Sequence, residues 1–280
     1  MKQYKKPVAL VAALALMATL LAGCGGGDGK SAEGLSGKEV LAKVQENTQK
    51  AKSLSYEMSM LVDLTAEMGG DSQSASITMD MNVNVINEPM KLMATTKTDI
   101  LGTSQEMQIY AEEVDGTLTM YASPDNGATW TPTSMDMSQY DMAENLDTYM
   151  AMFKDVKESG KKTINGVEAT QYDCIIPNDK LVDMIEASGT LDSISGTGGM
   201  STEDLSALIA DMGDLTFTIW VDTEKYLPVQ YSYDMSEIMG KMMEDMIPGA
   251  KVNITKTLIE MTVTGVDTVN TIDRPASIAE

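Results

Sequence analysis

Two stretches of the chain alternate apolar and polar residues with a period of two, and this alternation strongly constrains the fold. From Leu54 to Met68 every even position is apolar, and all odd positions but one are polar. From Ala75 to Val85 the odd positions are apolar and the even positions are polar. Successive side chains of a β-strand point to opposite faces, so each stretch is predicted to be a long strand with one buried face. The Gly-Gly-Asp sequence at 69–71 predicts a turn that joins the two strands as a hairpin.

The rest of the chain predicts further strands and a few helices. Ser36 and Glu39 have the S-x-x-E spacing of a capping box at the start of the first helix. Because long strands follow one another directly, we expect one α+β domain over residues 38–276, a curved antiparallel sheet with helices covering its concave apolar face. The same order disfavours a two-lobed solute-binding protein, in which strands and helices alternate. The expected strands lie near 90–100, 105–112, 116–122, 163–176, 215–222, 228–235 and 252–265, and the helices near 37–52, 139–153, 178–188 and 202–212.

Residues 1–23 have the features of a bacterial lipoprotein signal peptide. Three lysines among the first six residues precede an apolar run from Pro7 to Leu21, which is shorter than the ~20 residues of a membrane span. The Leu-Ala-Gly-Cys sequence ending at Cys24 looks like a lipobox, which predicts cleavage before Cys24 and lipid attachment to its thiol. Residues 24–37 are rich in Gly and Ser and predict a flexible tether. We therefore expect a lipid-anchored protein on the extracytoplasmic face of the cell membrane.

The charge and the residue content exclude several classes of function. Loss of residues 1–23 leaves 17 basic and 42 acidic residues, a formal charge of −25, which repels nucleic acid. Such a surface serves solubility, or it attracts a cationic partner or loosely held Ca²⁺. With Cys24 acylated, Cys174 is the one remaining cysteine and is expected to be a small core residue. No nucleophile motif, phosphate loop or metal-spaced cluster stands out, so we predict no catalytic residue, no metal, no cofactor and no enzyme activity.

Methionine is abundant on the predicted strand faces. After loss of Met1 and Met17, 23 of the 25 methionines remain, against two phenylalanines in the whole chain. Methionine is flexible and polarisable, and it suits surfaces that accept varied apolar shapes. We interpret four methionines as lining a cavity for a lipid or other apolar ligand: Met58, Met60, Met79 and Met81.

Other interpretations of these methionines and of the whole chain stay open. The methionines could form an ordinary core in place of leucine, or bind copper through thioethers, which is weak without histidine. The chain could instead be a non-catalytic structural or sensory envelope module that binds protein or cell-wall partners through its acidic surface.

A single S-x-D-x-G-x-x-W motif runs from Ser123 to Trp130 and resembles the Asp-box hairpin of sialidases and other β-propellers. Propellers repeat the motif, and sialidases use several arginines, whereas this chain has one copy and one arginine, Arg274. We therefore predict a structural turn in which Asp125 and Gly127 set the backbone and the tryptophan packs over it.

Several short motifs resemble those of the LolA/LppX-like bacterial lipoproteins, nearest to an uncharacterised Gram-positive branch. They are LSY at 54–56, INGVEA at 164–169, IWVDTEKYLPV at 219–229 and TGVDTVNTIDRP at 264–275. The resemblance spans about 38–276 and implies a half-barrel sheet whose concave side is plugged by helices. Characterised relatives carry lipids or lipoproteins in that cavity, and the family has no shared catalytic residues. LolA itself is a soluble carrier without an anchor, so the resemblance does not extend to shuttling across a periplasm.

Overall fold

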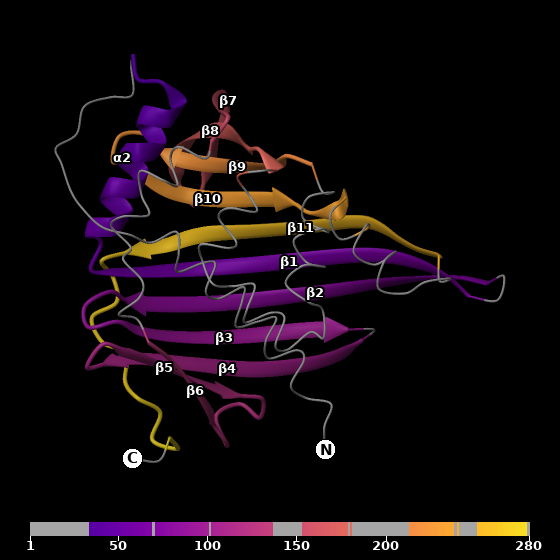
Figure 1. Cartoon of the computed structure of the whole chain (residues 1–280), viewed down its shortest axis with the longest axis vertical. Helices are drawn as coiled ribbons and strands as arrows, with labels where there is room; N and C mark the ends of the chain where they lie inside the picture. Colours follow the sequence, from indigo (N-terminus) through magenta and orange to yellow (C-terminus); the bar gives the residue numbers. More distant parts are fainter. Residues whose placement is uncertain are drawn as a thin grey trace. The chain divides into compact units, whose positions relative to one another are not determined.

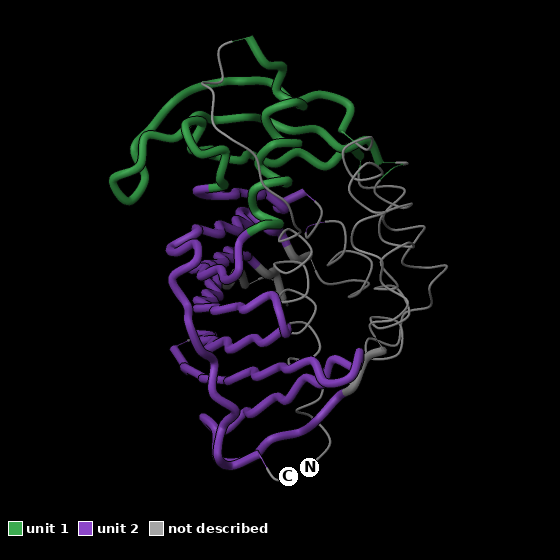
Figure 2. The backbone as a smooth tube through the Cα atoms, turned by 90° about the vertical axis from the view of Figure 1, so that its left-hand side faces the viewer, with its two compact units in different colours: residues 1–50, 142–228 green, residues 51–141, 229–280 purple. Residues whose placement is uncertain are grey.

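The computed structural model describes residues 34–68, 71–100, 102–136, 153–178, 180, 213–237, 240 and 251–278. The chain divides into two compact units (Figure 2): the first comprises residues 1–50 and 142–228, the second residues 51–141 and 229–280. Each unit therefore combines segments that are far apart in the sequence. The helices predicted near 139–153, 178–188 and 202–212 lie almost entirely outside the described residues.

The second unit is an antiparallel sheet with the strand order β6-β5-β4-β3-β2-β1-β11-β10 (Figure 1). The predicted fold class, α+β with a curved antiparallel sheet, is confirmed, and every strand expected in this unit is present. Among the described residues of this unit, β6 is the one strand that the sequence did not predict. The strands are β1 (Ser53–Met68), β2 (Asp71–Ile86), β3 (Lys91–Ile100), β4 (Thr103–Val114), β5 (Thr117–Ser123), β6 (Thr131–Asp136), β10 (Leu227–Asp234) and β11 (Lys251–Val266).

The predicted hairpin of β1 and β2 is paired along its full length. Its register runs without a shift from Ser53 opposite Ile86 to Met68 opposite Asp71. The even positions of β1 and the odd positions of β2 consequently share one face of the sheet, as the alternation predicts. Eight of these side chains are buried: Leu54, Tyr56, Met58, Val62, Met79, Met81, Val83 and Val85.

The C-terminal segment, residues 267–278, packs on the opposite face of the same sheet. Ile272 and Ile278 form a buried cluster with Tyr110 on β4. The residues that flank Tyr110 along β4 point to the other face, which carries the buried side chains of β1 and β2. Arg274 forms an ion pair with Glu112 at 3.1 Å, and the Tyr110 hydroxyl donates a hydrogen bond to Glu112 at 2.8 Å. The segment thus anchors itself by apolar packing and by one partly buried charge pair.

The first unit contains helix α2 (Gly37–Lys50) and the strands β7 (Asp155–Ile164), β8 (Val167–Ile176) and β9 (Leu215–Asp222), in the order β9-β8-β7. The capping box is confirmed, because the Ser36 amide donates to Glu39 Oε2 at 2.7 Å and the Glu39 amide donates to Ser36 Oγ at 3.3 Å. The hydrogen bonds from Ser36 lower the pKa of Glu39. Helix α2 buries Val40, Leu41 and Val44 and lies against β7.

The single strand predicted over 163–176 is wrong at its start. Strand β7 ends at Ile164, and Asn165 (φ 48°) and Gly166 (φ 83°) form a two-residue turn into β8. Positive φ at both central residues is typical of the type I′ hairpin that Asn-Gly favours. The predicted core position of Cys174 on β8 is confirmed, since it is buried and burial raises the pKa of its thiol to about 12.

Candidate functional site

One row of directly opposed residues crosses six strands of the second unit and contains four methionines. Cross-strand neighbours of this kind are close enough for their side chains to pack. Every member except Met107 is at most 8% exposed. We call this set the methionine row: Met107 on β4, Thr96 on β3, Met81 on β2, Met58 on β1, Met261 on β11 and Tyr231 on β10.

The structure brings together all four methionines that the sequence predicts as a ligand-binding surface. Met58 and Met81 belong to the methionine row, and Met60 and Met79 face each other in the next row of the same hairpin. Met79 is buried, whereas Met60 is only partly buried. A role for these residues in ligand binding stays a prediction.

Three buried hydroxyl groups on this apolar face have no hydrogen-bond partner among the described residues. They belong to Tyr56 on β1, Thr96 in the methionine row and Thr257 on β11. Thr257 lies directly opposite the buried Val62. An unpartnered buried hydroxyl costs roughly 1–3 kcal/mol, so three on one face are unusual for a dry core. Burial also raises the pKa of Tyr56, which keeps its hydroxyl neutral and able to donate.

The described part of the chain offers little else for chemistry on this face. It contains no group of three or more Cys, Asp or Glu side chains placed to hold a metal ion. Within the same residues, no helix has the length and apolar character needed to cross a membrane. The predicted lipid-attachment residue, Cys24, lies outside the described residues. The face is an apolar surface that carries a few buried hydroxyl groups.

The S-x-D-x-G-x-x-W motif forms the tight turn that the sequence predicts. Ser123 Oγ donates to Asp125 Oδ1 at 2.8 Å and accepts the Gly127 amide at 2.7 Å. The amide and hydroxyl of Thr129 donate to the two carboxylate oxygens of Asp125 at 2.8 and 2.6 Å. Gly127 has a φ of 87°, a conformation that favours glycine.

This turn also holds the C-terminal segment. Trp130 Nε1 donates to Ser277 Oγ at 2.9 Å, and Ser277 Oγ donates to the carbonyl of Gly127 at 2.7 Å. The motif is therefore a structural clip between β5–β6 and the end of the chain, which the sequence alone did not indicate.

We expect Asp125→Asn to reduce the dependence of the free energy of unfolding on pH in the acid range. Hydrogen bonds from Thr129, and then from Ser123, lower the pKa of Asp125 to about 2. A folded-state pKa below the unfolded value of about 4 stabilises the fold above pH ~4, and this stabilisation is lost as the pH falls toward 2. Urea midpoints measured between pH 5 and pH 2 should fall more steeply for the parent than for the variant. Asp80→Asn, an exposed change on β2, serves as the control, and equal slopes for all three proteins would contradict the assignment.

The described fold places this chain in a class: α+β proteins built on an antiparallel sheet of long strands. Within that class, the chain belongs to the family of unknown function DUF6612, whose model matches residues 36–280. No curated protein gives a significant match.

Several solved structures are similar to this chain at low sequence identity. The lipoprotein LppX of Mycobacterium tuberculosis matches with a TM-score of 0.44 and 12% identity, over 85% of this chain and 98% of that one. LprF of Mycobacterium bovis matches with a TM-score of 0.42 and 13% identity, over 86% and 97%. A LolA superfamily protein of Nitrosomonas europaea matches with a TM-score of 0.19 and 9% identity, over 85% and 96%. This likeness concerns the fold and does not extend to a ligand.

Proposed function

We propose that this chain is a membrane-anchored extracytoplasmic lipoprotein that binds a lipid or other apolar ligand over the methionine row. The proposal rests on one observation: a buried apolar face that crosses six strands carries three hydroxyls without partners among the described residues. A ligand with a long apolar part and a few oxygen atoms would pack against the methionines and satisfy the hydroxyls. Methionine adapts its shape at low energetic cost, which favours ligands of variable chain length.

The anchor in this proposal is the lipid on Cys24. A signal peptide, a lipobox and a Gly/Ser-rich tether follow one another in the sequence, and each is expected at the start of a lipoprotein. The tether of residues 24–37 would have a root-mean-square reach of roughly 20 Å. The binding domain would therefore stay close to the membrane, where apolar ligands are concentrated. Mass spectrometry of the N-terminal peptide tests this part, and a free thiol on Cys24 would disprove it.

The ligand is tested with the chain from residue 24 carrying Cys24→Ser and purified without detergent. We expect organic extraction and native mass spectrometry to reveal a bound lipid, and the stripped protein to take up a fluorescent fatty acid. Met58→Ala should weaken this uptake by removing part of the methionine row, whereas Ser59→Ala, an exposed neighbour on β1, should not. The absence of both lipid and fatty-acid uptake would refute the binding function, whatever the state of the anchor.

Thr96→Val should stabilise the ligand-free protein and weaken ligand binding. Thr96 is 1% exposed, and the substitution removes its hydroxyl, which has no partner among the described residues. The free energy of unfolding should therefore rise by about 1 kcal/mol. The same loss should lower the affinity for ligands with carbonyl or hydroxyl oxygens. Chemical denaturation and fatty-acid titration measure the two effects. Thr95→Val, on the exposed face of β3, is the matched control, and a destabilised Thr96→Val would show that the hydroxyl is satisfied in the native protein.

A further inference from the structure

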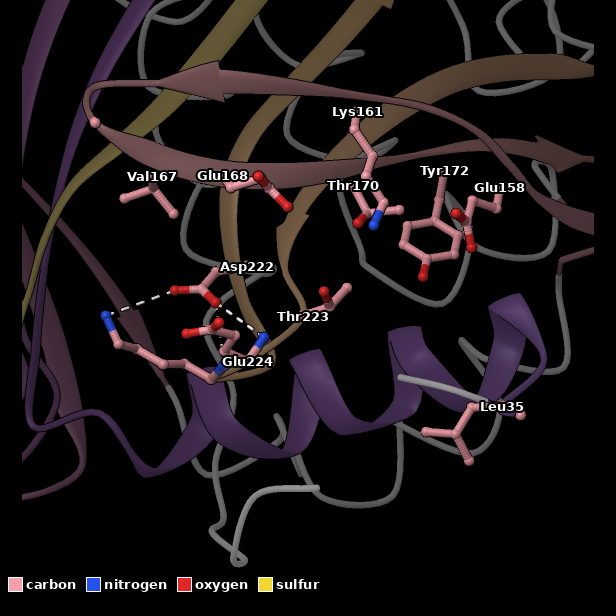
Figure 3. Close-up of a pocket in the computed structure, with 13 residues that line it drawn as sticks. Leu35, Glu158, Lys161, Val167, Glu168, Thr170, Tyr172, Asp222, Thr223 and Glu224 are labelled. Carbon is pink, nitrogen blue, oxygen red and sulfur yellow. Dashed lines mark hydrogen bonds and ion pairs between the residues drawn. The ribbon is translucent and has the colours of Figure 1, made fainter. Parts of the chain in front are cut away.

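The first unit contains a polar pocket that the proposed function does not use. It has a volume of about 740 Å³ and is lined by Gly34 and Leu35, by β7 and β8, and by residues 222–225 at the end of β9 and in the turn that follows (Figure 3). This volume is within the range of ~300–1,000 Å³ common for small-molecule sites. All of the lining residues belong to the first unit, so the pocket is a property of that unit alone.

Two largely buried residues with hydroxyl groups line this pocket. Along β8 the buried face changes from Cys174, in the apolar part, to Tyr172 and Thr170, which reach the pocket. Tyr172 is 2% exposed and Thr170 is 4% exposed. Figure 3 shows the Tyr172 hydroxyl pointing into the pocket, with no hydrogen bond to it from the residues drawn. Burial raises the pKa of Tyr172 to about 12, and the negative charge of Glu158 adds to this effect. The hydroxyl therefore stays protonated in a site that has no described partner for it.

The pocket is also acidic. Four carboxylates and two lysines line it, a formal charge of −2. One carboxylate, Asp222, is committed to the turn, because Oδ1 accepts the amides of Glu224 and Lys225 at 3.0 and 3.1 Å. Its other oxygen pairs with the Lys225 ammonium at 3.6 Å. Asp222 thus fixes the turn that carries Glu224, and the remaining carboxylates are Glu158 on β7, Glu168 on β8 and Glu224.

These three glutamates come from three different segments around the pocket. They do not gather at one point, since no three acidic side chains of the described residues are placed to hold one metal ion. Separated carboxylates fit a ligand whose positive charges are also separated. Ammonium groups donate hydrogen bonds to carboxylates and to hydroxyl oxygens, and bonds between charged partners are the stronger kind. The methylene groups between such charges can pack against Leu35 and Val167 at the wall of the pocket.

We infer that this pocket binds a small organic polycation, a polyamine with two or more ammonium groups. The glutamates pair with the ammonium groups, and the Tyr172 and Thr170 hydroxyl oxygens accept further N–H donors. The formal charge of −25 on the mature chain draws such cations toward the protein. Selection among cations then depends on the spacing of charges in the pocket.

Spermidine is the probe for this inference, titrated by calorimetry into the chain from residue 24 with Cys24→Ser. We expect one equivalent to bind. Glu168→Gln combined with Glu224→Gln should weaken binding roughly tenfold or more, and Tyr172→Phe several-fold. Glu168 and Glu224 are exposed, so their double variant should keep the fold intact. This variant tests the inference even if Tyr172→Phe does not fold. Matched controls are Glu57→Gln and Tyr121→Phe in the second unit, which should leave the affinity for spermidine unchanged.

Three results would overturn the inference. Binding of several equivalents that responds equally to pocket and control variants would mean general attraction to the acidic surface. Displacement of spermidine by one equivalent of Ca²⁺, lost in the pocket variants, would mean a metal site. Binding of neutral N-acetylglucosamine instead of spermidine would mean a sugar site. Since the methionine row lies in the other unit, fatty-acid uptake should be the same in pocket variants and parent, so this inference and the proposed function can fail independently.

Discussion

Met81→Asp is expected to unfold the second unit. Met81 is 1% exposed in the middle of the methionine row, between Thr96 on β3 and Met58 on β1. An aspartate there either buries a charge without a cationic partner or takes up a proton, and both are costly. The loss should be on the order of 5 kcal/mol, as large as the whole stability of many domains. Circular dichroism and chemical denaturation of the purified protein would show it as a lost or strongly weakened transition.

Asn82→Asp is the matched control for this experiment. It introduces the same side chain one residue further along β2, at an exposed position, because neighbouring strand residues face opposite sides. The control should unfold close to the parent. If Met81→Asp were equally stable, its side chain would have to reach water, and the buried methionine row would be refuted together with the binding surface built on it.

Gly37→Ala should destabilise the first unit, although the same change usually stabilises a helix. Alanine is better than glycine within helices by about 1 kcal/mol. At Gly37, however, a Cβ atom would meet the backbone carbonyl oxygen of Val156 and would lie 2.7 Å from its Cγ1. Backbone atoms of β7 cannot rotate away as a flexible side chain can, so the helix must shift from the strand. Overpacking of this kind costs typically 1–3 kcal/mol, and we expect a lower melting temperature.

Gly160→Ala on β7 provides the comparison. A Cβ there would lie 3.5 Å from Gln171 Oε1, an ordinary contact, so this variant should melt close to the parent. A Gly37→Ala protein that is more stable than the parent would mean that α2 does not approach Val156 as closely as described. Calorimetric scans of the three proteins decide between these outcomes.

Alternation along the sequence was sufficient to predict most of the strands. In β1 and β2 every buried apolar residue was predicted from the period of two, because one face is apolar from Leu54 to Met68 and from Ala75 to Val85. The capping box at Ser36 and Glu39 likewise predicted the start of α2, since it depends only on residues three apart. These are local patterns, and local patterns can be read without knowing the fold.

Features that depend on strand register could not be predicted from the sequence. The sequence placed Met58 and Met81 on apolar faces, but nothing local put Met261 and Thr96 in line with them across β11 and β3. Strand β7 was missed because few of its side chains are buried and a bulge interrupts its pairing near Glu158. The pocket in the first unit depends on three segments that meet only in the folded chain.

The pairing of β1 with β11 joins residues that are about two hundred positions apart, such as Leu54 and Val266. If the chain is exported from its N-terminus, β1 to β5 emerge early and can form their hairpins at once, because each pairs with its neighbour in sequence. The other edge of β1 stays open until nearly the last residues arrive, and an open edge invites pairing with other chains. Aggregation during secretion should therefore be most severe for truncated forms that end before β11, and a short peptide with the sequence of β11 should suppress it by closing that edge in advance.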